Sequence, residues 1–123
     1  MNTAPVFLLV ESSPILRSVL HKWLQDTLHD PRILIAENGG EALQRAAHEG
    51  PSHVLTEINL PDRTGFEILH RLRRSLPTAK IVATGWYDHS FHLDRIKSTG
   101  ADGYILKDKL ASELLPLWDI PIE

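Results

Sequence analysis

Hydrophobic residues along this chain gather in short runs that recur at regular intervals. The clearest run covers residues 6–10, where five apolar residues follow one another. A continuous apolar run of this length is typical of a strand that is covered on both faces, as in a parallel sheet. We therefore predict five strands, at residues 6–10, 33–36, 53–56, 80–84 and 103–106.

A helix is predicted directly after the first strand. Ser13 and Pro14 have the chemistry of an N-cap followed by a proline at the first helical position. The apolar residues after them have helical spacing and are expected to form one stripe: Leu16, Val19, Leu20, Trp23 and Leu24.

Two further helices begin with the spacing of a capping box, in which a glutamate stands three residues after the cap. The pairs are Asn38 with Glu41 and Thr64 with Glu67, and an apolar set follows each of them. These patterns predict the second and third helices.

The last two helices are less regular. The fourth is predicted from near Asp88 to Gly100, a glycine suited to the end of a helix. The last begins around Leu110, and because Pro116 interrupts its backbone hydrogen bonds we expect it to be short or kinked.

Strands that alternate with helices predict an α/β fold. Right-handed crossovers then give a doubly wound parallel sheet with helices on both faces. No linker or repeat interrupts the pattern, so residues 1–123 are predicted to form a single domain. In such sheets ligands bind at the carboxyl ends of the strands. The polar residues expected there are Glu11, Ser12, Ser13, Glu57, Thr84 and Lys107.

Composition removes several classes of function. With no cysteine, the chain has no disulfides, thiolate zinc sites or cysteine nucleophiles. Its 16 Asp and Glu outnumber 13 Lys and Arg, without a block of one sign, so direct nucleic-acid binding is not expected. No apolar run approaches the ~20 residues of a membrane span. We expect a cytoplasmic protein that does not enter the membrane.

Four local motifs, in this order, resemble the receiver domain of two-component response regulators. They are VESSP at 10–14, AENGGEAL at 36–43, INLP at 58–61 with Gly65, and GADGYILK at 100–107. The resemblance covers nearly the whole chain. It implies a five-stranded, flavodoxin-like sheet with the strand order 2-1-3-4-5.

The resemblance also implies a site. A working receiver takes a phosphoryl group from a histidine kinase onto an aspartate, beside a divalent metal held by that aspartate, an acidic pair and a backbone carbonyl. Here the acceptor position is Glu57, and the acidic-pair positions are Glu11 and Ser12. If the site is retained, the metal ligands are Glu11, Glu57 and Asn59.

Three further positions match the switch residues of the family. Thr84 and Lys107 correspond to its hydroxyl and lysine, and Tyr104 corresponds to its switch aromatic. The resemblance implies that Tyr104 couples the site to the face formed by the fourth helix, the fifth strand and the last helix. That face is where we expect a protein partner or a second copy of the chain.

The substitutions predict a loss of phosphotransfer. Mg²⁺ needs well-placed oxygen ligands at ~2.0–2.1 Å, and one carboxylate is missing while two are lengthened. An extra methylene moves the acceptor oxygen by more than about 1 Å, whereas in-line attack needs reacting atoms ~3–3.5 Å apart. The hydroxyls of Ser12, Ser13 and Thr56 do not replace the carboxylate that forms the family's acyl phosphate. We expect no cofactor and, at most, weakened Mg²⁺ binding.

Two interpretations of Glu57 stay open at this point. Its longer side chain can reach toward Lys107 or Thr84 and imitate the phosphorylated state. Alternatively the site has drifted, and Glu57 with Lys107 is only a neutralised buried pair.

The leading hypothesis is therefore a degenerate receiver, a protein-interaction module that works without phosphorylation and is not an enzyme. One alternative is a receiver that retains Mg²⁺-dependent phosphotransfer from a histidine kinase, and another is a small-ligand binder on the same fold. A histidine kinase and an output domain outside this sequence are the other expected partners. The chain is either a stand-alone module or part of a longer protein.

The remaining candidates have ordinary interpretations beside functional ones. His89 and His92 are read as solvated helix residues rather than metal ligands. Trp86 and Tyr87 suit either a partner surface or a lid over the site. The arginines Arg71, Arg73 and Arg74 are interpreted as a soluble helix face, and the apolar residues at 117–122 pack either on a partner or on the domain itself.

Overall fold

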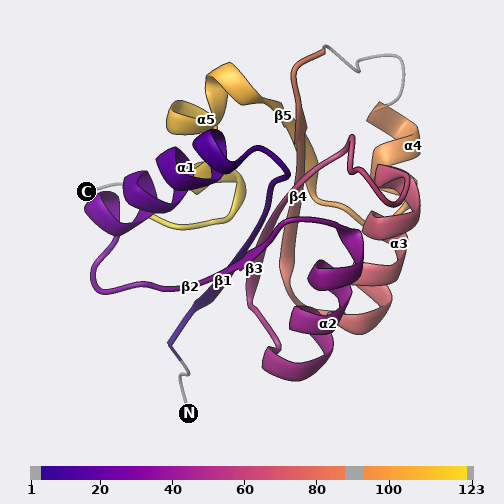
Figure 1. The fold of residues 1–123 in the computed structure, drawn as a ribbon, viewed down its shortest axis with the longest axis horizontal. Coiled ribbons are helices and arrows are strands. Elements are labelled where there is room, and N and C mark those ends of the chain that lie inside the picture. The colour runs from indigo at the N-terminus through magenta and orange to yellow at the C-terminus, as the bar shows by residue number, and fades with distance from the viewer. Residues whose placement is uncertain (1–3, 88–92, 122–123) are drawn as a thin grey trace.

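The computed structural model describes residues 4–87 and 93–121, and it is built around a five-stranded parallel sheet (Figure 1). The strands lie in the order β2-β1-β3-β4-β5, which confirms the predicted doubly wound fold. Their bounds are β1 Val6–Val10, β2 Arg32–Ala36, β3 His53–Glu57, β4 Lys80–Gly85 and β5 Gly103–Leu106.

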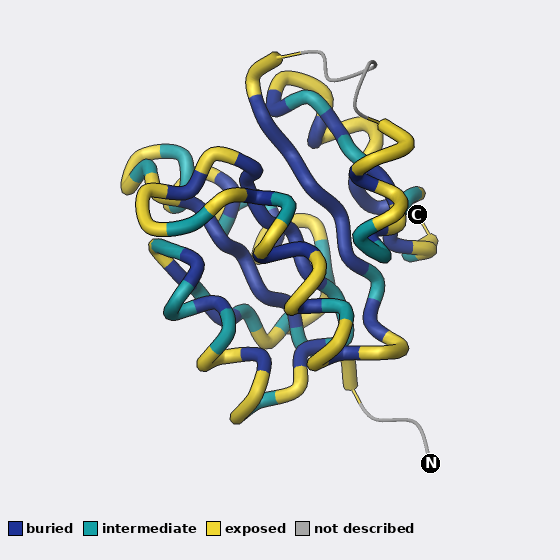
Figure 2. The backbone as a smooth tube through the Cα atoms, turned by 90° about the vertical axis from the view of Figure 1, so that its right-hand side faces the viewer, coloured by how far each residue is buried: buried dark blue, intermediate teal, exposed yellow. Residues whose placement is uncertain are grey.

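Helices cover both faces of this sheet. The helices α1 and α5 lie on one face, and α2, α3 and α4 lie on the other (Figure 1). The three inner strands β1, β3 and β4 are buried except at their first residues, as their apolar runs require, whereas the edge strands β2 and β5 are only partly buried (Figure 2). The bounds are α1 Pro14–Thr27, α2 Gly39–Glu49, α3 Gly65–Ser75, α4 Leu93–Ser98 and α5 Leu110–Leu117, with a 3₁₀ turn, η2 Lys107–Lys109, before α5. Among the described helices, none has the length and hydropathy to cross a bilayer.

The start of α1 follows the prediction, and so does its apolar stripe except at Val19. Ser13 is the N-cap, and its hydroxyl accepts a hydrogen bond from the backbone N–H of Leu16. Val19 was expected in the core, yet 56% of it is exposed, and the neighbouring Ile15 is 79% exposed. The prediction was wrong for Val19 because a residue at the edge of a helical stripe faces the sheet or the solvent according to how the helix is rotated on it.

The two capping boxes form only in part. Asn38 and Thr64 cap α2 and α3 as predicted, each accepting from the backbone N–H three residues on. In a capping box the glutamate side chain would accept from the backbone N–H of the cap residue, and neither glutamate does so. The carboxylate of Glu41 accepts from the backbone N–H of Glu37, and that of Glu67 forms ion pairs with arginine side chains. The sequence therefore located the caps correctly but not the partners of the glutamates.

The fourth helix can be compared with its prediction only at its end. It ends at Ser98, two residues before Gly100, whose φ of 97° is the left-handed backbone that glycine favours at a helix end. The predicted start near Asp88 and the pair His89 and His92 lie outside the described residues.

Arg73 was interpreted as part of a soluble helix face, and that interpretation is wrong. Its guanidinium donates to the backbone carbonyls of Gly100 and Ala79, at 2.8 and 2.7 Å, and pairs with Asp102 at 3.0 Å. It therefore ties the end of α3 to the segments before β4 and β5. The hydrogen bonds to Gly100 and Asp102 join residues that are far apart in the sequence, so the local pattern of charges could not predict them.

The end of the chain packs on the domain itself at Trp118. The side chain is fully buried, and its indole Nε1–H donates to the carbonyl of Val54 at 3.1 Å. The ring lies 5.4 Å from that of Phe7 and 5.5 Å from the imidazole of His53, between centroids. Of the two interpretations of this segment, self-packing is therefore correct for Trp118.

Candidate functional site

Three charged side chains meet at the carboxyl ends of the strands. Glu11 directly follows β1, Glu57 ends β3, and Lys107 follows β5. The ammonium Nζ of Lys107 donates to Glu11 Oε1 at 2.7 Å and to Glu57 Oε2 at 2.8 Å. All three side chains are buried, with exposed fractions of 4% for Lys107, 2% for Glu11 and 7% for Glu57. Parallel strands bring these ends together because they all leave the sheet at the same edge.

Each oxygen of the two carboxylates already accepts a hydrogen bond. Besides Lys107, Glu11 accepts at Oε2 from the backbone N–H of Ser13, at 3.0 Å. Glu57 accepts at Oε1 from the backbone N–H of Ser12, at 2.8 Å, and also from the Ser12 hydroxyl. The first turn of the loop after β1 thus holds both glutamates, and Ser12 closes the cluster where the family has a second acid.

The two glutamates respond in opposite directions to this environment. Burial raises the pKa of Glu11, and the nearby charge of Glu57 adds to the rise, against hydrogen bonds from Lys107 and Ser13. Burial acts in the same direction on Glu57, but the bonds from Lys107 and Ser12 outweigh it, so the pKa of Glu57 is lowered. Glu57 is therefore the firmly ionised partner of Lys107, and Glu11 is the second, less well compensated carboxylate.

These opposite shifts predict a pH dependence of stability. Because the pKa of Glu57 is lowered by folding, this residue stabilises the folded protein at pH values above the ordinary glutamate pKa. That stabilisation is lost as the pH falls through the lowered pKa. Because the pKa of Glu11 is raised by folding, its contribution to the stability of the folded protein is present at pH values below the ordinary glutamate pKa. This contribution is lost as the pH rises through the raised pKa. In urea unfolding from about pH 4 to about pH 8, Glu11→Gln should gain stability relative to the native protein as the pH rises. The exposed Glu113→Gln serves as the control, and a parallel trend for both variants would contradict the assignment.

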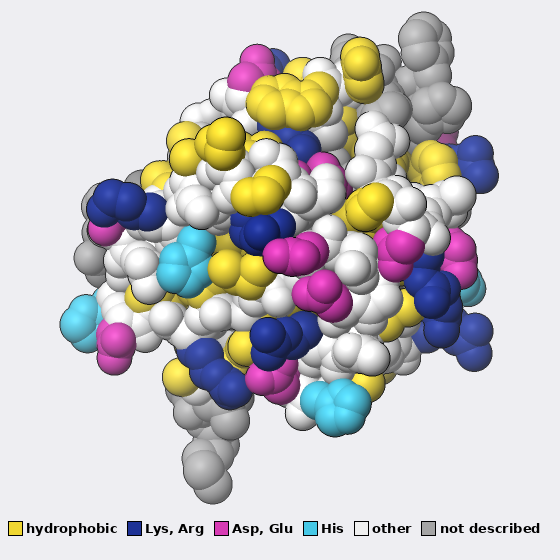
Figure 3. All heavy atoms as spheres, viewed as in Figure 1, with side chains coloured by type: hydrophobic (Ala, Val, Ile, Leu, Met, Phe, Trp, Pro, Cys, Tyr) yellow, Lys and Arg dark blue, Asp and Glu magenta, His cyan; other side chains and the backbone are white. Residues whose placement is uncertain are grey.

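Trp86 covers the cluster from above. The Lys107 ammonium lies 5.3 Å from the centroid of its ring, a distance at which a cation is attracted to an aromatic face. The indole is nevertheless 62% exposed, and Figure 3 shows hydrophobic side chains gathered near the ends of the strands on this side of the molecule. Trp86 therefore acts as a partial lid, one of its two predicted interpretations, and still presents aromatic surface to the solvent.

The donor set does not assemble a site for Mg²⁺. The space between the carboxylates of Glu11 and Glu57 is filled by the Lys107 ammonium, within 2.8 Å of both. Asn59, whose backbone carbonyl is the third ligand implied by the resemblance, lies on the loop after β3. Within residues 4–87 and 93–121, no three acidic or histidine side chains are grouped to hold a metal. Glu11 and Glu57 are brought together, but around an ammonium instead of an ion with open coordination positions.

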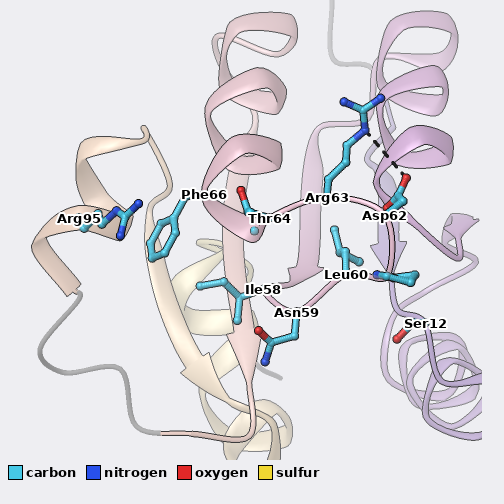
Figure 4. A pocket seen from close by; sticks show the side chains of 11 residues that line it. Ser12, Ile58, Asn59, Leu60, Asp62, Arg63, Thr64, Phe66 and Arg95 are labelled. Atoms are coloured by element: carbon cyan, nitrogen blue, oxygen red, sulfur yellow. Dashed lines mark ion pairs between the residues drawn. The ribbon is translucent and has the colours of Figure 1, made fainter.

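A surface pocket of about 760 Å³ adjoins the cluster (Figure 4). Phe66 and Arg95 line it at one end and Ser12 at the other, with Asn59 between them. The Arg95 guanidinium lies 4.0 Å above the Phe66 ring. The pocket therefore leads from the solvent to Ser12, whereas Glu57 lies behind it and is buried.

The expected switch hydroxyl and aromatic point to other partners. Thr84 pairs in register with Glu57, but its hydroxyl donates to the carbonyl of Ile105 at 2.6 Å. The Tyr104 hydroxyl donates to the carbonyl of Tyr87 at 2.6 Å. Its ring lies over Gly85, where an added Cβ would come within 2.6 Å of that hydroxyl, so only glycine permits this approach. Lys107 is thus the one of the three positions that reaches Glu57.

Two supporting residues were missed by the sequence analysis. The guanidinium of Arg17 donates to the carbonyl of Glu11 at 2.8 Å and fixes the loop after β1. Asp62 accepts from the backbone N–H groups of Gly39 and Gly40, at 2.8 and 2.9 Å, and these bonds lower its pKa. Asp62 is separated from Gly39 and Gly40 by 23 and 22 positions in the sequence, so no local pattern could have revealed these bonds.

Comparisons with known proteins agree with this architecture. The family model of the response regulator receiver domain matches residues 7–117. The nitrate/nitrite response regulator protein NarL of Escherichia coli (strain K12) is 29% identical over 108 residues, which are 88% of this chain and 50% of NarL. This chain therefore spans about half the length of that relative.

Solved structures share the fold at low sequence identity. One is a response regulator from Burkholderia pseudomallei with a phosphorylated aspartic acid, a calcium ion and citrate; it is 21% identical, with a TM-score of 0.85 over 93% of this chain and 66% of that chain. Another is the chemotaxis response regulator CheY4 of Vibrio cholerae, 23% identical, with a TM-score of 0.81 over 94% of this chain and 99% of that chain.

Proposed function

The chain belongs to the response regulator receiver domain family, and from this premise we propose that it is a receiver with a closed acceptor site, which acts as a protein-interaction module without phosphorylation. On this proposal the domain is not an enzyme. The observation that carries it is the position of the Lys107 ammonium, hydrogen-bonded to both glutamates where an acceptor site would need an open cation position.

The chemistry of phosphoryl acceptance supports this proposal. An acceptor carboxylate needs one oxygen free for in-line attack, with the reacting atoms ~3–3.5 Å apart. Glu57 has no such oxygen. Its Oε2 accepts a hydrogen bond from the Lys107 ammonium, and its Oε1 accepts from both the backbone N–H and the hydroxyl of Ser12. Hydrogen bonds to a charged group are each worth about 1.5–3 kcal/mol, so freeing Glu57 is costly.

The same contacts support a fixed signalling state. Glu57 brings negative charge to Lys107 permanently, as a phosphorylated acceptor would do only after modification. A ligand shifts a conformational equilibrium only if it binds the two states differently. Without a phosphoryl group that binds one conformation more tightly than another, the domain keeps a single conformation. In that conformation the Tyr104 hydroxyl donates to the carbonyl of Tyr87, and partners bind the domain in this form.

The partner surface on this proposal is the face formed by α4, β5 and α5. Tyr104 belongs to it, and a cleft of about 370 Å³ runs along β5 and α5 beside that residue. A protein partner or a second copy of the chain would bind there. A histidine kinase and an output domain in a longer protein are further candidate partners, since the match to this chain covers only 50% of NarL.

Incubation with acetyl phosphate and Mg²⁺, followed by intact-mass measurement, tests the proposal. The native chain should show no gain of a phosphoryl group after incubation at either neutral or mildly acidic pH. A stoichiometric, Mg²⁺-dependent mass gain located on Glu57 would instead establish the alternative of retained phosphotransfer. The response regulator of Burkholderia pseudomallei, whose structure contains a phosphorylated aspartic acid, controls for the reagents.

A further inference from the structure

His53 lies half-buried at the start of β3, the opposite end of that strand from Glu57. Between centroids, its imidazole is 5.0 Å from the ring of Phe7 and 5.5 Å from that of Trp118. His53 also lines a surface cavity of about 430 Å³ between the start of β1, the α1–β2 loop and the segment after α5. The imidazole is therefore packed into the domain and still accessible to protons from the solvent.

The Nδ1 atom of this imidazole has a hydrogen-bond partner in either charge state. Ser52 Oγ lies 2.8 Å from it. The same hydroxyl accepts from the backbone N–H of Val6 at 3.0 Å and lies 3.2 Å from the Val6 carbonyl. When Nδ1 is unprotonated, the Ser52 hydroxyl donates to it. When Nδ1 carries a proton, it donates to Ser52, and the hydroxyl turns to the Val6 carbonyl. His53 therefore takes up a proton within the folded domain without leaving a buried polar group unpaired.

Two side chains of opposite charge act on this imidazole. Lys80, at the start of β4, and Asp119, after α5, form an ion pair with 2.9 Å between Nζ and Oδ2. Burial lowers the pKa of His53 and the charge of Lys80 adds to the lowering, against a backbone hydrogen bond to Trp118 and the charge of Asp119. The other titratable or charged residues that line the cavity beside the ring are His29, Asp30 and Arg32. The protonated imidazole and Lys80 are thus two cations beside one carboxylate.

Asp119 is also the residue at which the chain turns after α5. Its φ of 59° is left-handed backbone, which is less favourable for an aspartate than the right-handed form. The turn is closed by two backbone hydrogen bonds, from the N–H of Asp119 to the carbonyl of Pro116 at 3.0 Å and from that of Ile120 to Leu115 at 2.9 Å. The ion pair with Lys80 ties the turn to β4, so a change of partner for the Asp119 carboxylate would alter it.

From this arrangement we propose that His53, Lys80 and Asp119 form a pH-sensitive latch on the turn after α5. In mildly acidic solution the protonated imidazole competes with Lys80 for the Asp119 carboxylate, and the turn at residues 119–121 loosens. Because the pKa of His53 is lowered from its ordinary value of 6.5, the closed latch is present above pH 6.5 and is lost as the pH falls through the lowered pKa. The latch does not depend on the function proposed above.

NMR of the full chain between about pH 7.5 and about pH 5 tests this proposal. The imidazole signals of His53 give the midpoint of its titration, and the amide signals of Asp119 and Ile120 report on the turn. These amide signals should shift with the midpoint of His53. The Ile120 amide should also lose protection from hydrogen exchange below that midpoint, relative to an unfolded peptide at the same pH, by at most about tenfold per pH unit. A mere effect of the ring's charge on nearby signals would leave this protection unchanged and would overturn the proposal.

Substitutions at the two partners vary the latch without changing the aromatic rings. Lys80→Met removes the competing cation and should raise the midpoint of His53. Asp119→Asn should lower it, and asparagine tolerates the left-handed backbone. Each change should be about 0.2–0.7 of a pH unit, as expected for a partly exposed pair of charges. The matched control His29→Gln, at an exposed histidine in the lining of the same cavity, should leave the midpoint unchanged.

The variant His53→Phe keeps an aromatic ring beside Phe7 and Trp118 but takes up no proton, so the pH-dependent shifts of the turn should disappear. The latch is refuted if these shifts persist in His53→Phe, or if His53 does not titrate in the folded native chain. It is also refuted if Lys80→Met and Asp119→Asn fail to move the midpoint of His53 in opposite directions.

Discussion

Replacement of Lys107 by methionine is expected to destabilise the protein by about 3–5 kcal/mol, the cost of breaking a buried ion pair by removing one partner. The Lys107 ammonium is the shared donor to Glu11 and Glu57, and its side chain is only 4% exposed. Without it, two carboxylates would face each other in a buried space. Urea or thermal unfolding at neutral pH measures this loss.

Two matched variants show whether charge is the cause. Lys109→Met, at an exposed lysine of the same 3₁₀ turn, should change stability by no more than about 0.5 kcal/mol. Adding Glu11→Gln and Glu57→Gln to Lys107→Met should restore much of the lost stability, because no buried charge then lacks a partner. If Lys107→Met were no more destabilising than Lys109→Met, the described cluster would not be a determinant of the fold.

The double replacement of Ser12→Asp and Glu57→Asp is expected to produce a Mg²⁺-dependent phosphoryl acceptor. The shorter side chain at position 57 withdraws the carboxylate by more than about 1 Å from Lys107 and Ser12. The new carboxylate at position 12 gives three acidic groups against one ammonium, which favours a divalent cation. With acetyl phosphate and Mg²⁺, the double variant should gain one phosphoryl group in intact-mass spectra, whereas the native chain should gain none.

The single variants separate the two contributions. Glu57→Asp alone lacks the second acid, and Ser12→Asp alone keeps the longer side chain, so each should gain far less phosphoryl than the double variant. Omission of Mg²⁺ should abolish the gain. If the double variant stayed unmodified while remaining folded, side-chain length and the missing acid would not be what closes the acceptor site.

The sequence predicted the framework well because the framework depends on local patterns. Apolar runs located all five strands to within one residue at each end, and the caps at Ser13, Asn38 and Thr64 were correct. Helix rotation was not predictable from the pattern alone, as the exposed Val19 shows. The position of a helix on the sheet depends on the packing of many side chains at once.

At the site, the sequence supplied the residues but not their bonds. Glu57 was expected to reach toward Lys107 or Thr84, and the structure selects Lys107. The closing contact from Ser12 joins residues 45 positions apart, and hydrogen bonds of that kind leave no local signal. The same reason hid the bonds of Arg73, which was misinterpreted as a solvated residue.

The most direct measurement is a titration of the native chain with Mg²⁺ and beryllofluoride, a mimic of the phosphoryl group, while the amide signals of Glu57, Thr84 and Lys107 are recorded. If the ammonium of Lys107 already fills the cation position, these signals will stay unchanged, and the double variant will show saturable shifts under the same conditions. Saturable shifts of these three signals in the native chain would contradict the account.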